Sequence, residues 1–323
     1  MKRTDNAITL VKRFPLNSAI FFMLLLTVIM PVACNEDEKF SEEMYKKVFC
    51  LIGDQDNVYA AAHSFENEVS DGFVSVYCGG SNPLDEDITI ELGYDNEIIG
   101  TYNYKYYDLN YDQYAKKLDE SKYELLTMVA TIKAGQDDPY VTFPLKLYTP
   151  GISPDSVYFI PLRIKSISGN GEINPDMVSV LYRPLVENKY AQTKVATSYA
   201  SRGERNGKEI VSTKTMYPLT ANQCRITVDT QTGLVDNKAD LTLVNKYGII
   251  LTVGEDNRVA LSPYGTIQVE PLGEPSENRY EVSDFKRFYL YYRYRTLVTP
   301  ATEGVDATYS DWTVIQEVLK RQN

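Results

Sequence analysis

Histidine is almost absent from this chain of 323 residues, in which His63 is the only copy. A mechanism with a histidine base would have to use His63, and a zinc site could not draw on two histidines. His63 follows three alanines, where we expect a core or surface side chain rather than a catalytic base or ligand. Glycine-rich phosphate loops, nucleophile elbows and EF-hand loops are also missing. The sequence therefore predicts a protein that is not an enzyme and holds no cofactor or metal ion.

Cysteine is scarce as well, with four copies at Cys34, Cys50, Cys78 and Cys224. If Cys34 is modified, three cysteines remain, and an odd number excludes a disulfide framework in which every cysteine pairs within the chain. The sequence does not reveal whether Cys50 and Cys78 are close enough to bond. We expect buried thiols that act as small apolar side chains.

Basic residues are too few for a nucleic-acid-binding protein. The chain has a net charge of −11, and removal of residues 1–33, which hold four basic residues and one acidic residue, leaves −14. Binding to a phosphate backbone needs a basic face, so nucleic acid is excluded as a partner. The many carboxylates are expected to be solvated, although a glycosidase pair facing each other across a cleft would not be visible in a sequence.

The first forty residues have the order of a bacterial lipoprotein signal. A basic start is followed by the apolar run 18–32 and then by Ala33 and Cys34, although Pro31 stands where a branched aliphatic residue is usual. We predict a signal peptide over 1–33, acylation of Cys34, and an acidic tether over 34–43. The membrane contact is then the lipid anchor only, because no later apolar run could span a bilayer. An ordinary signal peptide with an incidental cysteine is the alternative.

The rest of the chain predicts an all-β protein. Short runs rich in β-branched and aromatic residues alternate with glycine, proline and asparagine turns, a pattern typical of sandwiches and barrels. A break near 184–193 separates two series of strands, which indicates an N-terminal immunoglobulin-like β-sandwich over 44–186 and a C-terminal β-sandwich or barrel-like domain over 188–323. Residues 239–244 fit a strand, the best helix candidate is 111–118, and 312–319 fits a closing strand better than a helix.

Tyrosine is unusually frequent, with 26 copies, and flat aromatic rings suit the apolar faces of sugars. Tyrosine is also a preferred strand residue, so part of this enrichment is expected to fill a core. The tyrosines form two clusters. The first comprises Tyr102, Tyr104, Tyr106, Tyr107, Tyr111 and Tyr114. In the second, alternation places Tyr289 and Tyr291 on one face of a strand and Leu290, Tyr292 and Tyr294 on the other.

The ligand-binding residues predicted from the sequence are Trp312, Tyr309, Tyr292, Tyr289 and Tyr291.

Several short motifs resemble a family of Bacteroidetes surface lipoproteins. The glycine turn at 134–135, the strand 158–164 and residues 180–182 are similar to its N-terminal domain of unknown function, over about residues 44–186. Residues 229–233 and 288–292 carry a similar likeness to the β domain that follows it. This SusE-like family is associated with glycan-utilisation loci. The acidic tether of this chain resembles the stretch that directs Bacteroidetes lipoproteins to the outer face of the outer membrane.

The resemblance implies a function at the cell surface. We expect a non-catalytic, lipid-anchored protein of the outer membrane that binds glycan as an accessory of polysaccharide capture. Proteins of an outer-membrane uptake complex are possible partners. The alternative is a structural, adhesin-like or partner-binding lipoprotein. Neither the glycan, nor the binding face, nor the oligomeric state follows from the sequence.

Overall fold

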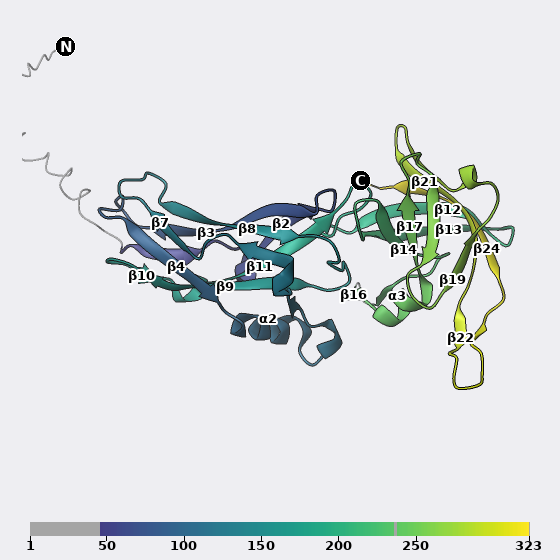
Figure 1. The fold of residues 1–323 in the computed structure, drawn as a ribbon, viewed down its shortest axis with the longest axis horizontal. Coiled ribbons are helices and arrows are strands. Elements are labelled where there is room, and N and C mark those ends of the chain that lie inside the picture. The colour runs from purple at the N-terminus through teal and green to yellow at the C-terminus, as the bar shows by residue number, and fades with distance from the viewer. Residues whose placement is uncertain (1–45, 236–237, 323) are drawn as a thin grey trace, which may run out of the picture.

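The computed structural model describes residues 46–235 and 238–322. The predicted signal peptide, Cys34 and the tether over 34–43 lie outside these residues. Two β-rich domains lie end to end along the longest axis of the molecule (Figure 1), which confirms the prediction of an all-β fold with two domains. Within the described ranges, no helix has the length and apolar character needed to cross a membrane.

The N-terminal domain is a sandwich of two sheets. In the first sheet the strand order is β10-β1-β3-β8-β6, with bounds Glu172–Ile173, Val48–Leu51, Val69–Gly79, Tyr140–Tyr148 and Tyr123–Leu125. In the second sheet the order is β2-β11-β9-β4-β7, with bounds Val58–Ser64, Ser179–Glu187, Tyr158–Ile167, Ile88–Tyr94 and Val129–Ile132. The short strand β5, Lys116–Lys117, pairs in parallel with β9.

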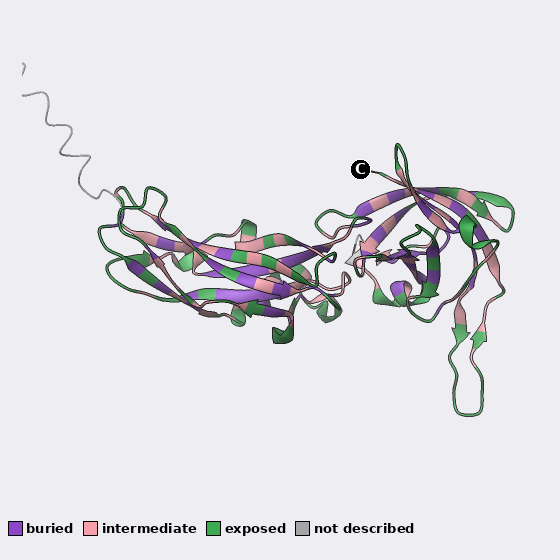
Figure 2. Ribbon diagram, turned by 45° about the horizontal axis from the view of Figure 1, so that its top comes forward, coloured by how far each residue is buried: buried purple, intermediate pink, exposed green. Residues whose placement is uncertain are grey.

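Alternation along the strands builds the core between these sheets. Inward side chains such as Phe49, Val74 and Phe143 are fully buried, while their sequence neighbours are partly or fully exposed. Figure 2 shows the same contrast, with buried residues between the layers of each domain. One core is drawn from residues 49–186 and a second from residues 190–319.

The C-terminal domain is a nine-stranded sheet that curls into a nearly closed barrel. The strand order is β18-β17-β14-β13-β12-β24-β21-β19, and β20 also pairs with β21. Val259 N donates to Asn278 O over 2.9 Å and Tyr280 N donates to Asn257 O over 2.8 Å, so the end of β20 bridges back to β18. The bounds are Val259–Pro263, Gly248–Val253, Gln223–Thr227, Lys208–Pro218, Thr197–Arg205, Thr313–Arg321, Lys286–Arg295 and Gln268–Pro271 in sheet order, and Arg279–Val282 for β20.

Two small hairpins complete the C-terminal domain. Strands β15, Leu234–Val235, and β16, Lys238–Ala239, pair with each other, as do β22, Leu297–Thr299, and β23, Thr308–Tyr309. The β22–β23 hairpin forms an arm that projects away from the barrel (Figure 1). At the turn between β12 and β13, Asn206 and Gly207 have φ values of 49° and 77°, the left-handed geometry that a two-residue hairpin requires.

The helices differ from the sequence-based expectation. Helix α2 spans Glu97–Tyr107, ahead of the expected helix at 111–118, where only the single 3-10 turn Tyr111–Gln113 forms. Helix α3 spans Leu241–Tyr247, so the prediction of a strand over 239–244 was wrong. The carboxylate of Asp240 accepts hydrogen bonds from Thr242 N and Leu243 N, and this N-cap favours the helix. The other 3-10 turns are Gln55–Asn57, Glu120–Lys122, Pro175–Met177 and Pro275–Glu277.

Candidate functional site

A cavity of about 300 Å³ lies where the two domains meet. Its walls in the N-terminal domain come from the end of α2, the 3-10 turn η3 (Tyr111–Gln113), the loop before β9 and the end of β11. In the C-terminal domain they come from β13 and the β15–β16 region. This volume is at the lower end of the range that small-ligand sites occupy. Two other hollows, of about 420 and 430 Å³ on the C-terminal domain, have no aromatic ring in their walls.

Tyrosine rings from the first cluster form one wall of this interdomain cleft. Tyr107 and Tyr114 both line it, and their ring centroids are 6.4 Å apart. The buried amide of Asn103 holds the segment after α2 in place, donating to Ala115 O over 2.9 Å and accepting from Ala115 N over 2.7 Å. Tyr114 also donates its hydroxyl to Asp108 O over 2.6 Å. The rings are therefore fixed before any ligand arrives.

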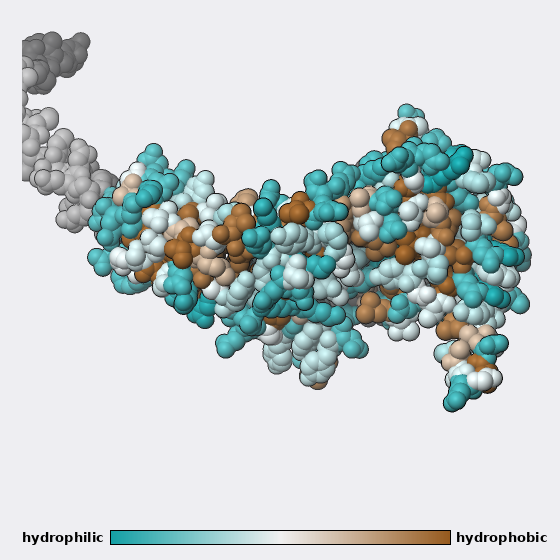
Figure 3. Space-filling view, in the orientation of Figure 1, coloured by the Kyte–Doolittle hydropathy of each residue, from teal (hydrophilic) through white to brown (hydrophobic). Residues whose placement is uncertain are grey.

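Tyr111 extends this aromatic wall onto the surface, and Tyr104 is exposed on helix α2 outside the cavity. Tyr104 and Tyr111 are 71% and 66% exposed, and the ring of Tyr111 lies 5.1 Å from that of Tyr114. The surface over α2 in Figure 3 is correspondingly pale, with neither a strongly hydrophilic nor a strongly hydrophobic character. An aromatic surface of this kind offers apolar contact area without forming a strongly hydrophobic patch.

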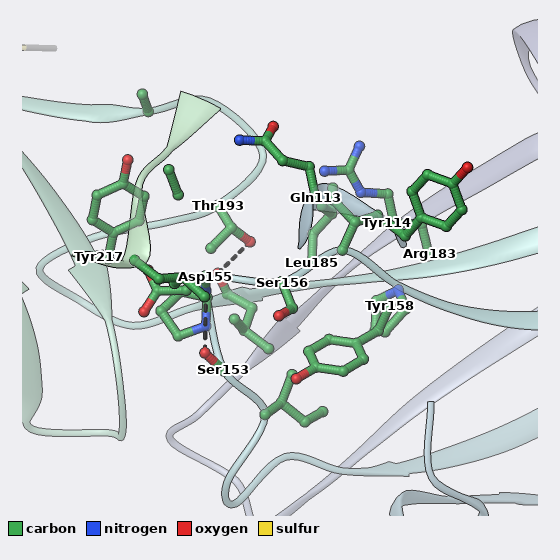
Figure 4. Close-up of a pocket in the computed structure, with 18 of the residues that line it drawn as sticks. Gln113, Tyr114, Ser153, Asp155, Ser156, Tyr158, Arg183, Leu185, Thr193 and Tyr217 are labelled. Carbon is green, nitrogen blue, oxygen red and sulfur yellow. Dashed lines mark hydrogen bonds between the residues drawn. The ribbon is translucent and has the colours of Figure 1, made fainter. Parts of the chain in front are cut away.

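Polar side chains face the same cavity. Gln113, Arg183 and Tyr114 gather on one side in the view of Figure 4, and Tyr217 lies across from them. Ser153, Ser156 and Thr193 bring hydroxyl groups, and Thr193 donates to Val186 O over 3.0 Å. Arg183 projects from β11 and forms no ion pair with any of the residues that the structure describes. The cleft thus combines aromatic rings with hydrogen-bonding groups.

A buried ion pair joins the domains beside the cleft. Asp155, in the loop before β9, pairs with the guanidinium of Arg225 on β14 and accepts a 2.7 Å hydrogen bond from the hydroxyl of Tyr264. The Arg225 guanidinium also packs 4.5 Å from the ring centroid of Tyr217, and its side chain is 2% exposed. Because both partners are out of water, separating the domains would strand a charge on each.

The side-chain amide of Asn188 holds the linker between the domains in place by hydrogen bonds. Asn188 donates to Thr220 O over 2.7 Å and to Gln223 O over 3.0 Å. Its side-chain oxygen accepts from Tyr190 N and Ala191 N over 3.0 and 2.9 Å. The linker is therefore folded onto the C-terminal domain, which restricts how far the cleft can open.

The phenols in and beside the cleft remain neutral at physiological pH. Burial raises the pKa of Tyr107, Tyr114 and Tyr217 above the ordinary value. Burial and the Asp155 hydrogen bond raise the pKa of Tyr264 to about 12. These groups can hydrogen-bond to a ligand without exchanging protons with it.

The ligand-binding residues predicted from the sequence lie elsewhere, on the C-terminal barrel. Trp312, Tyr309, Tyr289 and Tyr291 are partly exposed on its outside. Tyr292 is fully buried inside the barrel and donates its hydroxyl to Glu317 over 2.9 Å, so it shares no surface with Trp312. The reason is the two-residue period of β21, which sends Tyr292 and Tyr294 inward when Tyr291 points outward.

His63 is a core residue. Its side chain is 1% exposed, with Nε2 2.7 Å from the Tyr182 hydroxyl and Nδ1 2.9 Å from the Ser70 hydroxyl. Burial lowers the pKa of His63 to about 4, so the ring is neutral at pH 7. Within the described ranges, no three histidine, cysteine, aspartate or glutamate side chains gather closely enough to hold a metal ion.

No disulfide joins the cysteines that the structure describes. Cys78 and Cys224 are buried, and Cys50 is partly exposed. Burial raises the pKa of Cys224 to about 12 and also raises that of Cys50, so both remain unreactive thiols at neutral pH.

Family models and solved structures match this two-domain architecture. A family model described as an N-terminal domain matches residues 43–171, and another described as a C-terminal domain matches residues 178–320. No curated protein matches the chain. A protein of unknown function from Bacteroides ovatus is 17% identical with a TM-score of 0.60, covering 85% of this chain and 94% of its own.

Two further solved structures share both domains. A multidomain protein from Bacteroides ovatus is 16% identical, with a TM-score of 0.56 over 86% of this chain and 95% of its own. An "auxiliary nutrient binding protein" from Bacteroides thetaiotaomicron is also 16% identical, with a TM-score of 0.51 over 83% and 92%. The chain has the two-domain fold of these Bacteroides proteins. At such identities the likeness concerns the fold, and the finer resemblance to SusE-like lipoproteins stays a prediction.

Sequence reasoning did not find most of the cleft. Tyr107 and Tyr114 belong to a cluster that the composition points to, but Asp155, Arg183 and Tyr217 come from distant segments. The two domains meet only in the folded chain, and no local pattern marks these residues as neighbours.

Proposed function

We propose that this protein binds glycan in the cleft between its domains and catalyses no reaction. The observation that carries the proposal is the combination of Tyr107, Tyr114 and Tyr217 with the guanidinium of Arg183 and neighbouring hydroxyls in one preformed cavity. Sugars present apolar C–H faces and polar rims, which match rings and hydrogen-bonding groups respectively. The similarity in fold to a Bacteroides nutrient-binding protein supports the proposal.

The chemistry of the cleft favours binding over catalysis. Its tyrosines have pKa values raised away from neutrality, and the single histidine is buried elsewhere with both ring nitrogens engaged. A general acid or base is most effective when its pKa lies near the working pH. Two carboxylates line the cavity, Asp112 and Asp155, and Asp155 is already paired with Arg225.

Acylation at Cys34 would place this cleft at the outer face of the outer membrane. We predict that Cys34→Ala prevents incorporation of a fatty-acid analogue and releases the protein from the membrane. Labelling of cells that express either form measures this directly. Equal labelling of wild type and variant would contradict the anchoring proposal.

Glycan-array screening of the soluble fragment from Asn35 onward, followed by titration of variants, tests the binding proposal. Tyr114→Ala removes a ring of the cleft and should weaken binding by on the order of tenfold, whereas Tyr114→Phe should retain most of the affinity. Tyr104→Ala is the matched control, because Tyr104 is an exposed tyrosine of the nearby helix α2 that does not line the cavity. Equal loss in both alanine variants, or in neither, would place the ligand elsewhere.

Binding of a protein partner is a second candidate function, favoured by the β22–β23 arm. Val298 and Val305 on this arm are 66% and 58% exposed, and the arm projects from the barrel (Figure 1). Deletion of residues 299–307 should leave glycan binding intact under the first proposal. Loss of cell-surface assembly with glycan affinity unchanged would favour the partner-binding role.

A further inference from the structure

The outer wall of the barrel carries arginines stacked on aromatic rings. Trp312 directly precedes β24, whose first residue, Thr313, pairs with Tyr294 near the end of β21. The indole centroid lies 4.4 Å from the guanidinium carbon of Arg293 and 4.6 Å from that of Arg295. Arg295 also lies 4.9 Å from the ring centroid of Tyr309. The guanidinium of Arg295 is thus held between two rings at the base of the β22–β23 arm.

Arg293 and Arg295 differ in the partners that their guanidinium groups contact. Arg293 donates from Nε and Nη2 to the carboxylate of Glu270, over 2.8 and 2.5 Å. Arg295 donates from Nε to the neutral amide oxygen of Gln268 over 2.7 Å and forms no ion pair with any described residue. In a chain with net charge −11, this leaves an oriented cation whose two terminal amino groups have no acidic partner.

We propose that Arg295, Tyr309 and Trp312 form a second binding site, separate from the cleft, for an acidic sugar. The carboxylate of a uronic acid residue would accept two parallel hydrogen bonds from the terminal nitrogens of Arg295, an arrangement that the planar guanidinium favours. The partly exposed rings of Tyr309 and Trp312 would contact the C–H face of the same sugar. Stacking and the Gln268 hydrogen bond fix the guanidinium beforehand, which lowers the entropic cost of binding.

The rings favour a sugar over an acidic peptide as the occupant. A flexible carboxylate side chain would use the charge of Arg295 but would leave the two ring faces without a matching flat partner. A sugar ring with a carboxylate uses both features at once. The two occupants therefore differ in whether aromatic contact adds to the affinity.

Trp312 is the only tryptophan, so its fluorescence reports on this site alone. We expect trigalacturonate to change the emission of the soluble protein in a saturable way, and its fully methyl-esterified counterpart to bind at least about tenfold more weakly. Arg295→Gln should abolish the response. Arg279→Gln is the control, since Arg279 stacks 3.9 Å from the Tyr289 ring at the other end of β21 and should leave the response unchanged.

Three outcomes of the sugar titrations would overturn the proposal. These are an unchanged emission in the wild type, an equal response to acid and ester, and an Arg295→Gln variant that still responds. An oligoglutamate peptide of equal charge that gives the same saturable change at the same concentration would also overturn it, in favour of a protein ligand. Tyr114→Ala should retain the Trp312 response, so failure of the cleft proposal and failure of this one give different results.

Discussion

The two domains fill their interiors in different ways. Apolar side chains pack the N-terminal sandwich, whose nearly buried carboxylate, Asp155, faces the other domain rather than its own core. The C-terminal barrel encloses Lys214, Glu317 and Asp229, each at most 2% exposed. The sandwich buries its apolar side chains between two sheets, whereas the barrel also buries charged side chains, which pair with one another in a polar network. The N-terminal domain therefore depends on packing, and the C-terminal domain depends on packing and on buried charge pairs.

The centre of the polar network is Glu317. Its carboxylate lies 2.6 Å from the ammonium of Lys214 and accepts hydrogen bonds from the hydroxyls of Ser201 and Tyr292, over 2.7 and 2.9 Å. Burial, together with the Glu317 carboxylate, raises the pKa of Tyr292 well above its usual value. Tyr294 and Arg205 hold the second buried carboxylate, Asp229.

Breaking the Lys214–Glu317 pair should produce the largest loss of stability. Glu317→Ala strands a buried ammonium group, which typically costs about 3–5 kcal/mol. The double variant Lys214→Met with Glu317→Leu removes both charges at similar volume and should recover most of that loss. Urea denaturation measures both. A double variant as unstable as Glu317→Ala would show that packing rather than charge holds this part of the barrel.

Removal of the interdomain carboxylate should uncouple the domains. Asp155→Ala leaves Arg225 buried with only its stacking contacts to Tyr217 and Tyr264, and we expect a loss of about 3 kcal/mol. Calorimetry should then resolve two unfolding transitions where the wild type shows one. Two transitions already present in the wild type would contradict the idea that this contact couples the domains.

Acid should weaken the N-terminal sandwich through His63. Its folded pKa of about 4 lies below the unfolded value of 6.5, so the unfolded chain binds the proton more tightly. The stability contributed by the neutral ring is complete above pH 6.5 and is lost as the pH falls, by about 3 kcal/mol at pH 4. His63→Gln should lack this component. If the stabilities of wild type and variant fall by the same amount between pH 7 and pH 4, the prediction is wrong.

Substitution of an outward-facing side chain of the barrel should have the smallest effect. Trp312 is only partly buried and contacts arginines on the outside, so Trp312→Ala should change stability by about 1 kcal/mol or less. Leu290 points inward and is 1% exposed, so Leu290→Ala should cost about 2–5 kcal/mol. Thermal melts compare the two. A large loss of stability in Trp312→Ala would show that Trp312 packs in the core.

Strand periodicity explains what could be predicted of the fold. Residues 73–77, 141–145 and 288–295 alternate clearly, and all lie in strands whose side chains alternate between more and less buried positions. The segment 312–319 could also have formed a helix, but it pairs with β12 and β21 as a strand from Thr313 to Arg321. Tertiary pairing therefore decides between two periods that a short apolar pattern fits equally well.

Weak local patterns explain what was missed. Helix α2 contains glycine and four tyrosines, which are poor helix formers, and it is held by packing of Ile99 and Tyr102 around Phe159. Strand β2 is rich in alanine, a residue without strand preference, and forms by parallel pairing with β11. The cleft could not be predicted because Arg183 and Tyr217 become neighbours only when the domains dock.

Hydrogen–deuterium exchange with and without the glycan selected on the array tests most directly whether the interdomain cleft holds the ligand. The loops 107–114 and 153–157 line the cleft but lie outside its sheets, so their amides can report on occupancy. We predict slower exchange in both loops when the glycan is bound. Unchanged exchange in both loops, with protection confined to other parts of the protein, would contradict the assignment of the cleft as the glycan site.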